Sequence, residues 1–589
     1  MRRRPISGGA LNLGWWLTGA MSLGAMGCSP VPVAAQPPEA VVTLLHTSDW
    51  HSRVWPFRSR ISSFEAELGL GRAGALDEVG GLARLDSLLQ AAWQRAPSAV
   101  WLDSGDALEG AEIFHRYAGS AEIALLSALG LSAMALGNHE LSLPPAELAE
   151  RAVEARFPLL AANLSPRSSS PLLGAWSSSA LVKAGGLWLG VIGVANLRSP
   201  PSLSDAENTW QVTAARDSAH ALQTAIDEIS SRAALVVVLS HLGLDEDRAL
   251  VRSTTGVDVV LGGHQHLVTA EAEWEDDCQS FALQRSRGCA ARRVPIVHSG
   301  AYGKWLSRIE LQLVDDGAGY EVAELALGRA AASADVPPSP RVIAALEPLQ
   351  LPPEPPLAFA PTRIAREAAL GGDAALGNLT TDAVRLETGA DVVLLNTSGL
   401  RADIEAGLVS RGDLELAFPF EEPWRSGLVP GAALRRGLLR SSRKSAAREC
   451  VSALQVSGMR LRLRCSGCAD ANCVEAWRGD TRLDDAELVR VALPEYLASA
   501  GADFAELRPF TEPIALDVVA AISRYFSFSA LPARVAADCV EAALELSALR
   551  CGAAFGLAGC PVTAERARGL CGDLPRLAGG RDDRIQVLR

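Results

Sequence analysis

The chain has 589 residues, of which 48% are hydrophobic and 21% are charged, and its formal net charge at pH 7 is -13. This length predicts two substantial domains, and the composition excludes a disordered polymer. The acidic balance argues against a nucleic-acid polymer as partner, since such proteins need a basic surface. A nucleotide or another small phosphate ester stays compatible with it, because a local pair of metal ions can outweigh a distant acidic surface.

Residues 1–38 have the pattern of an export signal. Arg2-Arg3-Arg4 is a basic start, and residues 11–27 are apolar but short for a membrane span. Two cleavage sites compete, one before Cys28 in an approximate bacterial lipobox and one after Ala35 in a sequence suited to ordinary signal peptidase. The chain has 11 cysteines, and removing Cys28 leaves an even number for disulfides, which favours lipidation of Cys28. We expect a periplasmic or cell-envelope protein, held at a membrane only through a lipid anchor.

Residues 39–332 alternate apolar runs of strand length with segments of helical periodicity. One face of the first helical segment carries four large apolar residues: Leu82, Leu85, Leu89 and Trp93. Such alternation predicts a layered α/β domain.

Five apolar runs in this region end in side chains that can bind metal ions. In chain order, residues 41–45 precede Asp49 and His51, residues 99–102 precede Asp106, residues 132–136 precede Asn138 and His139, residues 235–239 precede His241, and residues 257–261 precede His264 and His266. Because ligands of an open α/β sheet bind at the carboxyl ends of its strands, these residues predict one shared site. Gly262 and Gly263 allow a sharp turn beside it.

The C-terminal half begins with a proline-rich segment, residues 333–359, which indicates a linker. A second domain follows over residues 360–545. Residues 546–589 form a cysteine-containing tail that matches no pattern.

The remaining cysteines are expected in disulfides. Cys278 and Cys289 would close an insertion between the His266 loop and the next strand. Cys465 and Cys468 imitate half of a zinc site, but no second Cys-x-x-Cys follows, so the exported context favours disulfides there too.

The ordered set of five motifs resembles the calcineurin-like metallophosphoesterases, and more closely the 5′-nucleotidase/UDP-sugar hydrolase family. The resemblance extends from about residue 41 to about residue 545. It implies a layered α/β metallophosphoesterase domain with mixed sheets and flanking helices, followed by a smaller α/β substrate-specificity domain. Any one motif would be weak, whereas five in the family order are specific.

The family motifs imply two divalent metal ions, zinc, manganese or similar, since the ligands are imidazole and oxygen without thiolate. One ion would be held by Asp49, His51, Asp106 and His266 and the other by Asp106, Asn138, His241 and His264. Asp106 would then be both the bridging carboxylate and part of the catalytic centre. Two such ions, roughly 3.5–4 Å apart, can acidify a bridging water and hold the ester oxygens.

His139 is the catalytic histidine that the resemblance implies, either stabilising the phosphoryl transition state or protonating the leaving oxygen. The family usually continues Gly-Asn-His-Glu-Phe-Asp, and that aspartate orients the histidine. This chain has Ser142 in its place, and serine carries no charge that favours an imidazolium. Either the activity is lower, or another carboxylate substitutes. Of the other histidines, His46 would support its loop by hydrogen bonding, and His298 could support the site from behind.

The second domain supplies substrate contacts in this family. Three sequences match its motifs: Leu376 to Leu379, Asn396 to Arg401 and the segment opened by Tyr496. Arg401 would bind the phosphate or carboxylate end of the substrate. The remaining expected substrate-binding residues are Arg363, Arg366, Asn396, Phe420, Tyr496 and Asp503. Phe420 and Tyr496 could sandwich a base, at roughly 1–3 kcal/mol per stacking contact.

The resemblance therefore implies an exported phosphohydrolase that acts on nucleoside monophosphates, and on UDP-sugars as a second class, by attack of a hydroxide bridging two metals. Two alternatives remain open. One is a 2′,3′-cyclic phosphodiesterase/3′-nucleotidase or a sulfur-ester hydrolase on the same scaffold. The other is a surface binding protein that keeps its metals but has lost turnover. The sequence does not report the oligomeric state.

Overall fold

The computed structural model describes residues 40–196, 212–214, 217–315, 319–349, 356–366, 372–419, 423–447, 453–464, 473–499, 502–528 and 585–588. The chain divides into two units, residues 1–38 and residues 39–589, and only the second contains described residues. The expected export signal and Cys28 lie outside the described residues.

The first sheet of the N-terminal half has six strands in the order β16-β15-β1-β4-β5-β6. Their bounds are Tyr320–Ala331 (β16), Trp305–Asp315 (β15), Ala40–Thr47 (β1), Val100–Asp103 (β4), Ala133–Ala135 (β5) and Leu159–Leu160 (β6). The last four strands of this order are parallel, whereas β15 and β16 pair antiparallel. Buried and partly buried residues alternate along β15, as in an antiparallel strand with one covered face.

The second sheet also has six strands, in the order β13-β14-β12-β11-β9-β8. Their bounds are Glu273–Asp276 (β13), Arg293–His298 (β14), Val259–Gly262 (β12), Leu235–Ser240 (β11), Leu187–Val194 (β9) and Ser179–Ala184 (β8). The four central strands are parallel and the two edge strands are antiparallel. The apolar strand β11 is buried along its whole length, because both faces of this parallel sheet are covered.

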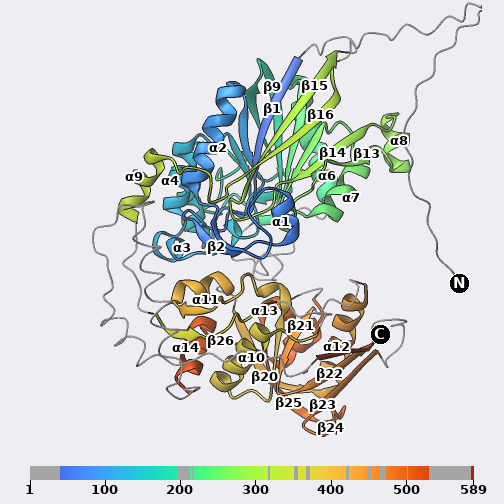
Figure 1. The fold of residues 1–589 in the computed structure, drawn as a ribbon. Helices are drawn as coiled ribbons and strands as arrows, with labels where there is room; N and C mark the ends of the chain where they lie inside the picture. Colours follow the sequence, from blue (N-terminus) through green and yellow to red (C-terminus); the bar gives the residue numbers. More distant parts are fainter. Residues whose placement is uncertain are drawn as a thin grey trace, which may run out of the picture. The chain divides into compact units, whose positions relative to one another are not determined.

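The two sheets pack face to face around one apolar core. That core joins Val42 and Leu44 of β1 to Val237 and Leu239 of β11. Helices cover the outer faces (Figure 1): α2 (Leu82–Arg95) and α4 (Ser120–Leu129) lie on the first sheet, and α6 (Ser218–Ile229) and α7 (Leu244–Arg252) lie on the second. The apolar face predicted for α2 is the face that packs on the core. The predicted layered α/β domain with mixed sheets and flanking helices is confirmed.

Shorter elements surround this sandwich. They are β2 (Phe57–Arg60), α1 (Ser63–Glu67), β3 (Leu76–Val79), α3 (Glu112–Tyr117), η1 (Glu140–Ser142), α5 (Pro145–Glu154), β7 (Leu164–Pro166), β10 (Val212–Ala214), α8 (Phe281–Arg287) and α9 (Pro340–Leu346). α9 lies in the predicted linker, yet it is held against α2. Arg341 donates to Asp86 there, and the Ser339 amide donates to the Ala83 carbonyl at 2.8 Å. The predicted domain limits stay predictions.

The C-terminal half is built on a five-stranded sheet in the order β21-β18-β25-β20-β26. Its strands are Leu454–Ser457 (β21), Val392–Asn396 (β18), Leu488–Pro494 (β25), Trp424–Pro430 (β20) and Glu512–Ile514 (β26). One face packs against α10 (Ala375–Thr388), α11 (Arg411–Ala417) and α14 (Val518–Phe528). The other packs against α12 (Gly431–Ala447) and a four-stranded sheet, β24-β23-β22-β27. The expected smaller α/β domain is confirmed.

The four-stranded sheet includes part of the predicted tail. Its strands are Thr481–Arg482 (β24), Val474–Arg478 (β23), Arg460–Arg464 (β22) and Ile585–Leu588 (β27). β27 pairs parallel with β22, and Ile585 is buried in the core of this half. Within the described ranges, no helix has both the length and the hydropathy that crossing a bilayer requires.

Candidate metal centre and active site

The predicted metal ligands converge because five parallel strands end beside one another. The loops after β1, β4, β5, β11 and β12 supply them, and these strands belong to the two packed sheets. Three groups of ligand atoms lie close enough to share an ion: Asp49, His51 and His266; His51, Asp106 and His139; and Asp106, His241 and His264. Asp106 belongs to two of these groups, as a bridging ligand would.

Backbone carbonyls orient two of the histidines. His51 donates from Nδ1 to the Glu109 carbonyl at 3.0 Å, and His241 donates from Nδ1 to the Ser104 carbonyl at 2.7 Å. A carbonyl can only accept, so both rings carry their proton on Nδ1 when neutral. The Nε2 lone pairs are left facing the interior of the cluster, because a carbonyl that accepts from Nδ1–H fixes the tautomer and the orientation of a metal-binding imidazole.

The donor set fits two divalent cations. His241 Nε2 is buried, lies 2.8 Å from Asp106 Oδ2, and still makes no hydrogen bond. His51 Nε2 and His266 Nε2 are 2.9 Å apart, and Asn138 Oδ1 is 3.0 Å from His264 Nδ1. Ring nitrogens and oxygens that converge in this way can present lone pairs to a shared cation. Imidazole nitrogens with carboxylate and amide oxygens suit zinc, manganese or a similar ion.

Asp106 dominates the electrostatics of the cluster. Burial opposes its ionisation, but His241 and His139 hold the pKa of Asp106 well below its usual range. Burial likewise works against the charge on His241, yet Asp106 raises the pKa of that ring to about 10. Burial raises the pKa of Asp49 to about 6. Asp106 is therefore the ionised carboxylate at the centre of the site, and such a carboxylate can bind cations.

A buried glutamate organises the loop that carries Asp106. The carboxylate of Glu140 accepts from the backbone amides of Asp106, Ala107, Leu108 and Gly137 at 2.7–3.1 Å. Asp106 in turn accepts from the His139 amide at 2.8 Å. The loops after β4 and β5 are thus locked to each other, and Asp106 is fixed on the side of the metal ligands.

The loop backbones are strained where they meet. Positive φ angles, uncommon outside glycine, occur at Asp49 (54°), Asp106 (55°), His264 (73°) and His266 (57°). Each such residue costs roughly 1–3 kcal/mol, and strain of this kind gathers at functional sites. Gly263 leaves no room for a side chain, since a Cβ there would overlap the Ser48 hydroxyl and lie 3.0 Å from Asp49 Oδ2.

His139, the expected catalytic residue, lies beside the ligands. Its Nε2 is 3.8 Å from Asp106 Oδ2, and its Nδ1 is 2.6 Å from Glu109 Oε2. Burial alone would lower the pKa of His139, but Asp106 and Glu109 outweigh it and raise the pKa to about 9. Ser142 donates instead to the Asn138 carbonyl at 3.4 Å. The carboxylate beside His139 is therefore Glu109, the substitution that the sequence left open.

Arg401 is the predicted substrate residue that reaches the metal ligands. Its Nη2 lies 2.6 Å and 2.8 Å from the two ring nitrogens of His266, and its Nε lies 3.4 Å from the Tyr302 hydroxyl. Asn396, at the end of β18, donates to Ser398 and has a buried Oδ1 without a hydrogen-bond partner. A guanidinium beside imidazole ligands can bind the oxygens of a phosphoryl group.

The other predicted substrate residues are placed less directly. Arg363 is paired with Asp403, whose carboxylate also accepts from the Arg366 amide at 2.8 Å. Tyr496 is 43% exposed. Asp503 forms an ion pair with Lys444 at 2.8 Å. Phe420 lies outside the described residues, so the predicted base sandwich stays a prediction.

Sequence reasoning missed four contributors. Glu109 and Glu140 contact residues that are distant from them in the sequence. Glu140 belongs to the Gly-Asn-His-Glu motif, but the motif does not indicate its role. The ring centroid of Tyr302 lies 5.0 Å from that of His266. The Arg53 guanidinium lies over the Tyr302 ring, 5.3 Å from its centroid. The Arg53 guanidinium is buried, and its Nε and Nη1 make no hydrogen bond. Neither residue belonged to a recognised spacing.

His46 and His298 lie behind the ligands. His46 bonds the hydroxyls of Ser104 and Ser299 at 2.9 Å and 2.6 Å, which matches the supporting role predicted for it. His298 Nε2 is 2.9 Å from Asp247 Oδ2, and a side chain at Gly262 would overlap this pair. His298 thus fills the space under the Gly262 turn.

The predicted disulfide between Cys278 and Cys289 is confirmed. Cys473 is also disulfide-bonded, which supports disulfides over a zinc site in that region. Cys278 is fully buried between α7 and β14, where its amide donates to the Thr254 carbonyl at 2.8 Å.

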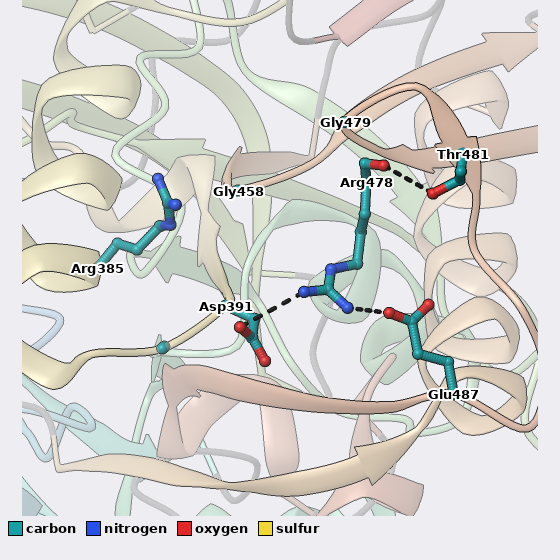
Figure 2. Close-up of a pocket in the computed structure, with 8 residues that line it drawn as sticks. Arg385, Asp391, Gly458, Arg478, Gly479, Thr481 and Glu487 are labelled. Carbon is teal, nitrogen blue, oxygen red and sulfur yellow. Dashed lines mark hydrogen bonds and ion pairs between the residues drawn. The ribbon is translucent and has the colours of Figure 1, made fainter.

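A polar depression of about 430 Å³ in the C-terminal half is separate from these residues. Figure 2 shows Arg478 between Asp391 and Glu487, both of which it pairs with, the first at 3.4 Å. Arg385 and the backbone turns at Gly458 and Gly479 complete its wall. The charge of Arg478 is already neutralised by these two carboxylates, and none of the predicted metal ligands lines the depression.

Comparison with known families adds to this geometry. Residues 42–268 match the calcineurin-like phosphoesterase family, and residues 354–508 match the 5′-nucleotidase C-terminal domain. The first match contains all the predicted metal ligands. The second contains Asn396, Arg401 and Tyr496.

Individual proteins are also similar to this chain. A 5′-nucleotidase of Bos taurus is 29% identical over 52% of this chain and 52% of its own length, so the chain spans about half of this curated relative. A 5′-nucleotidase precursor of Thermus thermophilus has the same fold, with a TM-score of 0.70 and 24% identity over 93% of this chain and 99% of that one. A sulfate thiohydrolase from Thermus thermophilus also shares the fold, with a TM-score of 0.66 and 18% identity over 94% and 98% of the two chains.

Proposed function

Because the chain belongs to the calcineurin-like phosphoesterases that carry a 5′-nucleotidase C-terminal domain, we propose that it is an exported two-metal phosphohydrolase that releases phosphate from nucleoside monophosphates. The observation that carries this proposal is the position of Asp106. Its carboxylate lies within 4.0 Å of Nε2 of His51, His139 and His241, which supports a bridging ligand with the catalytic histidine at its side. The bovine relative bears the name of this activity.

The ligands would hold two ions, with Asp106 common to both sets. Asp49, His51 and His266 complete one set, and Asn138, His241 and His264 complete the other. Two bound ions, zinc, manganese or similar, would supply positive charge for attack of water on phosphorus. The buried setting supports this role, because charge interactions strengthen where water is excluded.

The protein's own residues then act on the two ends of the phosphoryl group. Arg401 binds phosphoryl oxygens, which its closeness to His266 supports. His139 holds a proton on Nε2 and donates it to the ester oxygen as the phosphorus–oxygen bond breaks, while the attacking water loses its proton to solvent. The nucleoside leaves with the protonated oxygen, and inorganic phosphate remains.

The nucleoside end is assigned to the C-terminal half. Tyr496, which is 43% exposed, stacks on the base, and Phe420 is its proposed partner. Arg363 and Arg366 are assigned to substrate binding, and Asp403 accepts hydrogen bonds from the Arg363 side chain and the Arg366 amide. Asp503, which forms an ion pair with Lys444, is assigned to the base end of the substrate. UDP-sugars form the second substrate class of this proposal.

Chromatographic analysis of the products from a substrate panel tests the proposal, because cleavage of a cyclic ester or a UDP-sugar does not by itself release inorganic phosphate. The purified protein is assayed with manganese or zinc on AMP, 3′-AMP, 2′,3′-cyclic AMP and UDP-glucose, beside His139→Asn. We expect AMP to be hydrolysed fastest and His139→Asn to lose most activity while keeping both ions. Preference for the 3′ or cyclic ester would replace the 5′ assignment. Equal, very slow hydrolysis by both proteins would support the binding-protein alternative.

Export with lipidation of Cys28 is the second part of the proposal. The Cys278–Cys289 disulfide supports an oxidising compartment. Cys28→Ser should move the protein from the membrane fraction to the soluble exported fraction. A mature chain that begins after Ala35 would contradict the anchor.

A further inference from the structure

Two carboxylates hold the ring of His139 from opposite sides. Glu109 Oε2 lies 2.6 Å from Nδ1, and Asp106 Oδ2 lies 3.8 Å from Nε2. His139 is 9% exposed and Glu109 is 6% exposed, so the shorter contact is shielded from water. A short hydrogen bond to a charged acceptor is strong in such surroundings. This bond turns Nε2 toward the metal ligands.

Ser142, three residues after His139, makes no comparable contact. Its hydroxyl donates to the Asn138 carbonyl at 3.4 Å. The residue ends the short 3₁₀ helix η1, and His139 caps the start of that helix. Because side chains three residues apart eclipse in a 3₁₀ helix, position 142 is where a local partner for His139 would be expected. The chain has an uncharged residue at this position.

Glu109 is held too firmly for its contact to be incidental. Its φ of 59° is in the left-handed region, although it is not glycine. Its carbonyl accepts from His51 Nδ1 at 3.0 Å, and the preceding amide, that of Leu108, donates to Glu140 at 3.1 Å. A Cβ on Gly110 would lie 2.8 Å from His51 Cβ, so the chain passes His51 as closely as glycine allows. One residue thus orients His51 with its backbone and His139 with its side chain.

We propose that Glu109 is the positioning residue of His139, replacing from the β4 loop the carboxylate that position 142 lacks. This inference rests on the proposed function and explains how His139, the proposed proton donor, is oriented. The carboxylate accepts the hydrogen bond from Nδ1–H and fixes the orientation of the ring, so that Nε2 points at the leaving oxygen. Glu109 acts through His139 and touches no substrate.

Four variants test this assignment: Glu109→Gln, Ser142→Asp, Ser142→Ala and the double variant Glu109→Gln/Ser142→Asp. We expect Glu109→Gln to lower kcat for AMP about 100-fold, within the 10²–10⁴ range of positioned acid catalysis, with KM nearly unchanged and two ions still bound. Ser142→Asp alone should change kcat less than about threefold, because Glu109 already holds the ring. In the double variant, the carboxylate at position 142 should restore at least about tenfold of the lost kcat. Ser142→Ala is the matched control and should behave like wild type.

A readout independent of turnover accompanies the kinetics. A short imidazole–carboxylate hydrogen bond gives a proton resonance far downfield of the amides in NMR. That resonance should be present in wild type and Ser142→Ala and absent from Glu109→Gln and His139→Asn. Its presence in Glu109→Gln would overturn the proposed contact whether or not the protein hydrolyses AMP.

Three kinetic or analytical results would also overturn the inference: wild-type kcat in Glu109→Gln, a tenfold gain from Ser142→Asp alone, or loss of a metal ion in Glu109→Gln, which would make Glu109 a ligand. A wild-type protein that releases no phosphate from any ester, yet shows the resonance, would refute the proposed function and leave the contact standing.

Discussion

Replacing Glu140 by glutamine removes the acceptor that ties the Asp106 loop to the Asn138 loop. The carboxylate accepts two amides at each oxygen: Ala107 and Leu108 at Oε1, and Asp106 and Gly137 at Oε2. A glutamine keeps one oxygen and turns an NH₂ toward two buried donors. Two bonds to a charged group are lost at about 1.5–3 kcal/mol each, so we expect about 3–6 kcal/mol of destabilisation.

That loss is a large fraction of a typical unfolding free energy of about 5–15 kcal/mol. Urea unfolding in the presence of a chelator, followed by circular dichroism, measures it without a contribution from metal binding. Glu122→Gln is the matched control: this buried carboxylate accepts one bond, from the Ser52 hydroxyl at 2.6 Å, and its other oxygen has no partner. Glutamine can keep that bond, so we expect less than about 1 kcal/mol. Equal stability of the two variants would refute the reasoning.

Three further predictions follow from the same geometry. Asp106→Asn removes the shared charge and should abolish binding of both ions together with AMP hydrolysis; two tightly bound ions in that variant would show that Asp106 is not the bridge. Gly263→Ala should displace Asp49 and weaken metal binding at least tenfold by calorimetry, whereas Gly319→Ala, where a Cβ meets nothing, should not. Burial raises the pKa of Asp258 to about 6 in the folded protein, whereas an aspartate in the unfolded chain has a pKa of about 4. Between these two pH values, Asp258 is therefore protonated in the folded protein and ionised in the unfolded chain. The wild-type unfolding free energy relative to Asp258→Asn should therefore fall as pH rises from about 4 to about 6 and then level off; a flat or rising difference would contradict this.

The metal-ligand cluster was foreseeable because its residues obey a local rule. Each follows an apolar run, and parallel strands bring their carboxyl ends together whatever the intervening helices contain. The layered fold followed from the same runs. The helix face of Leu82, Leu85 and Leu89 was legible because it repeats with the helical period.

The contacts that tune the site could not be read in this way. Glu109 and His139 are 30 residues apart in the sequence, and their contact depends on a left-handed backbone conformation at Glu109. No periodic pattern in the sequence predicts that conformation. Glu140 binds backbone amides, which have no sequence signature. Arg401 and His266 are 135 residues apart, and their contact depends on how the C-terminal sheet meets the loops of the first half. The Ser142 departure signalled a missing partner without saying where its replacement lies.

We propose that two metal ions, both bound by Asp106, are required for hydrolysis of a nucleoside monophosphate. The most direct measurement titrates manganese into metal-free protein and follows bound metal and phosphate release from AMP on the same sample. We expect no phosphate release without metal and the maximal rate of release when two ions are bound per chain. Full activity at one ion per chain, or in the presence of excess chelator, would contradict it.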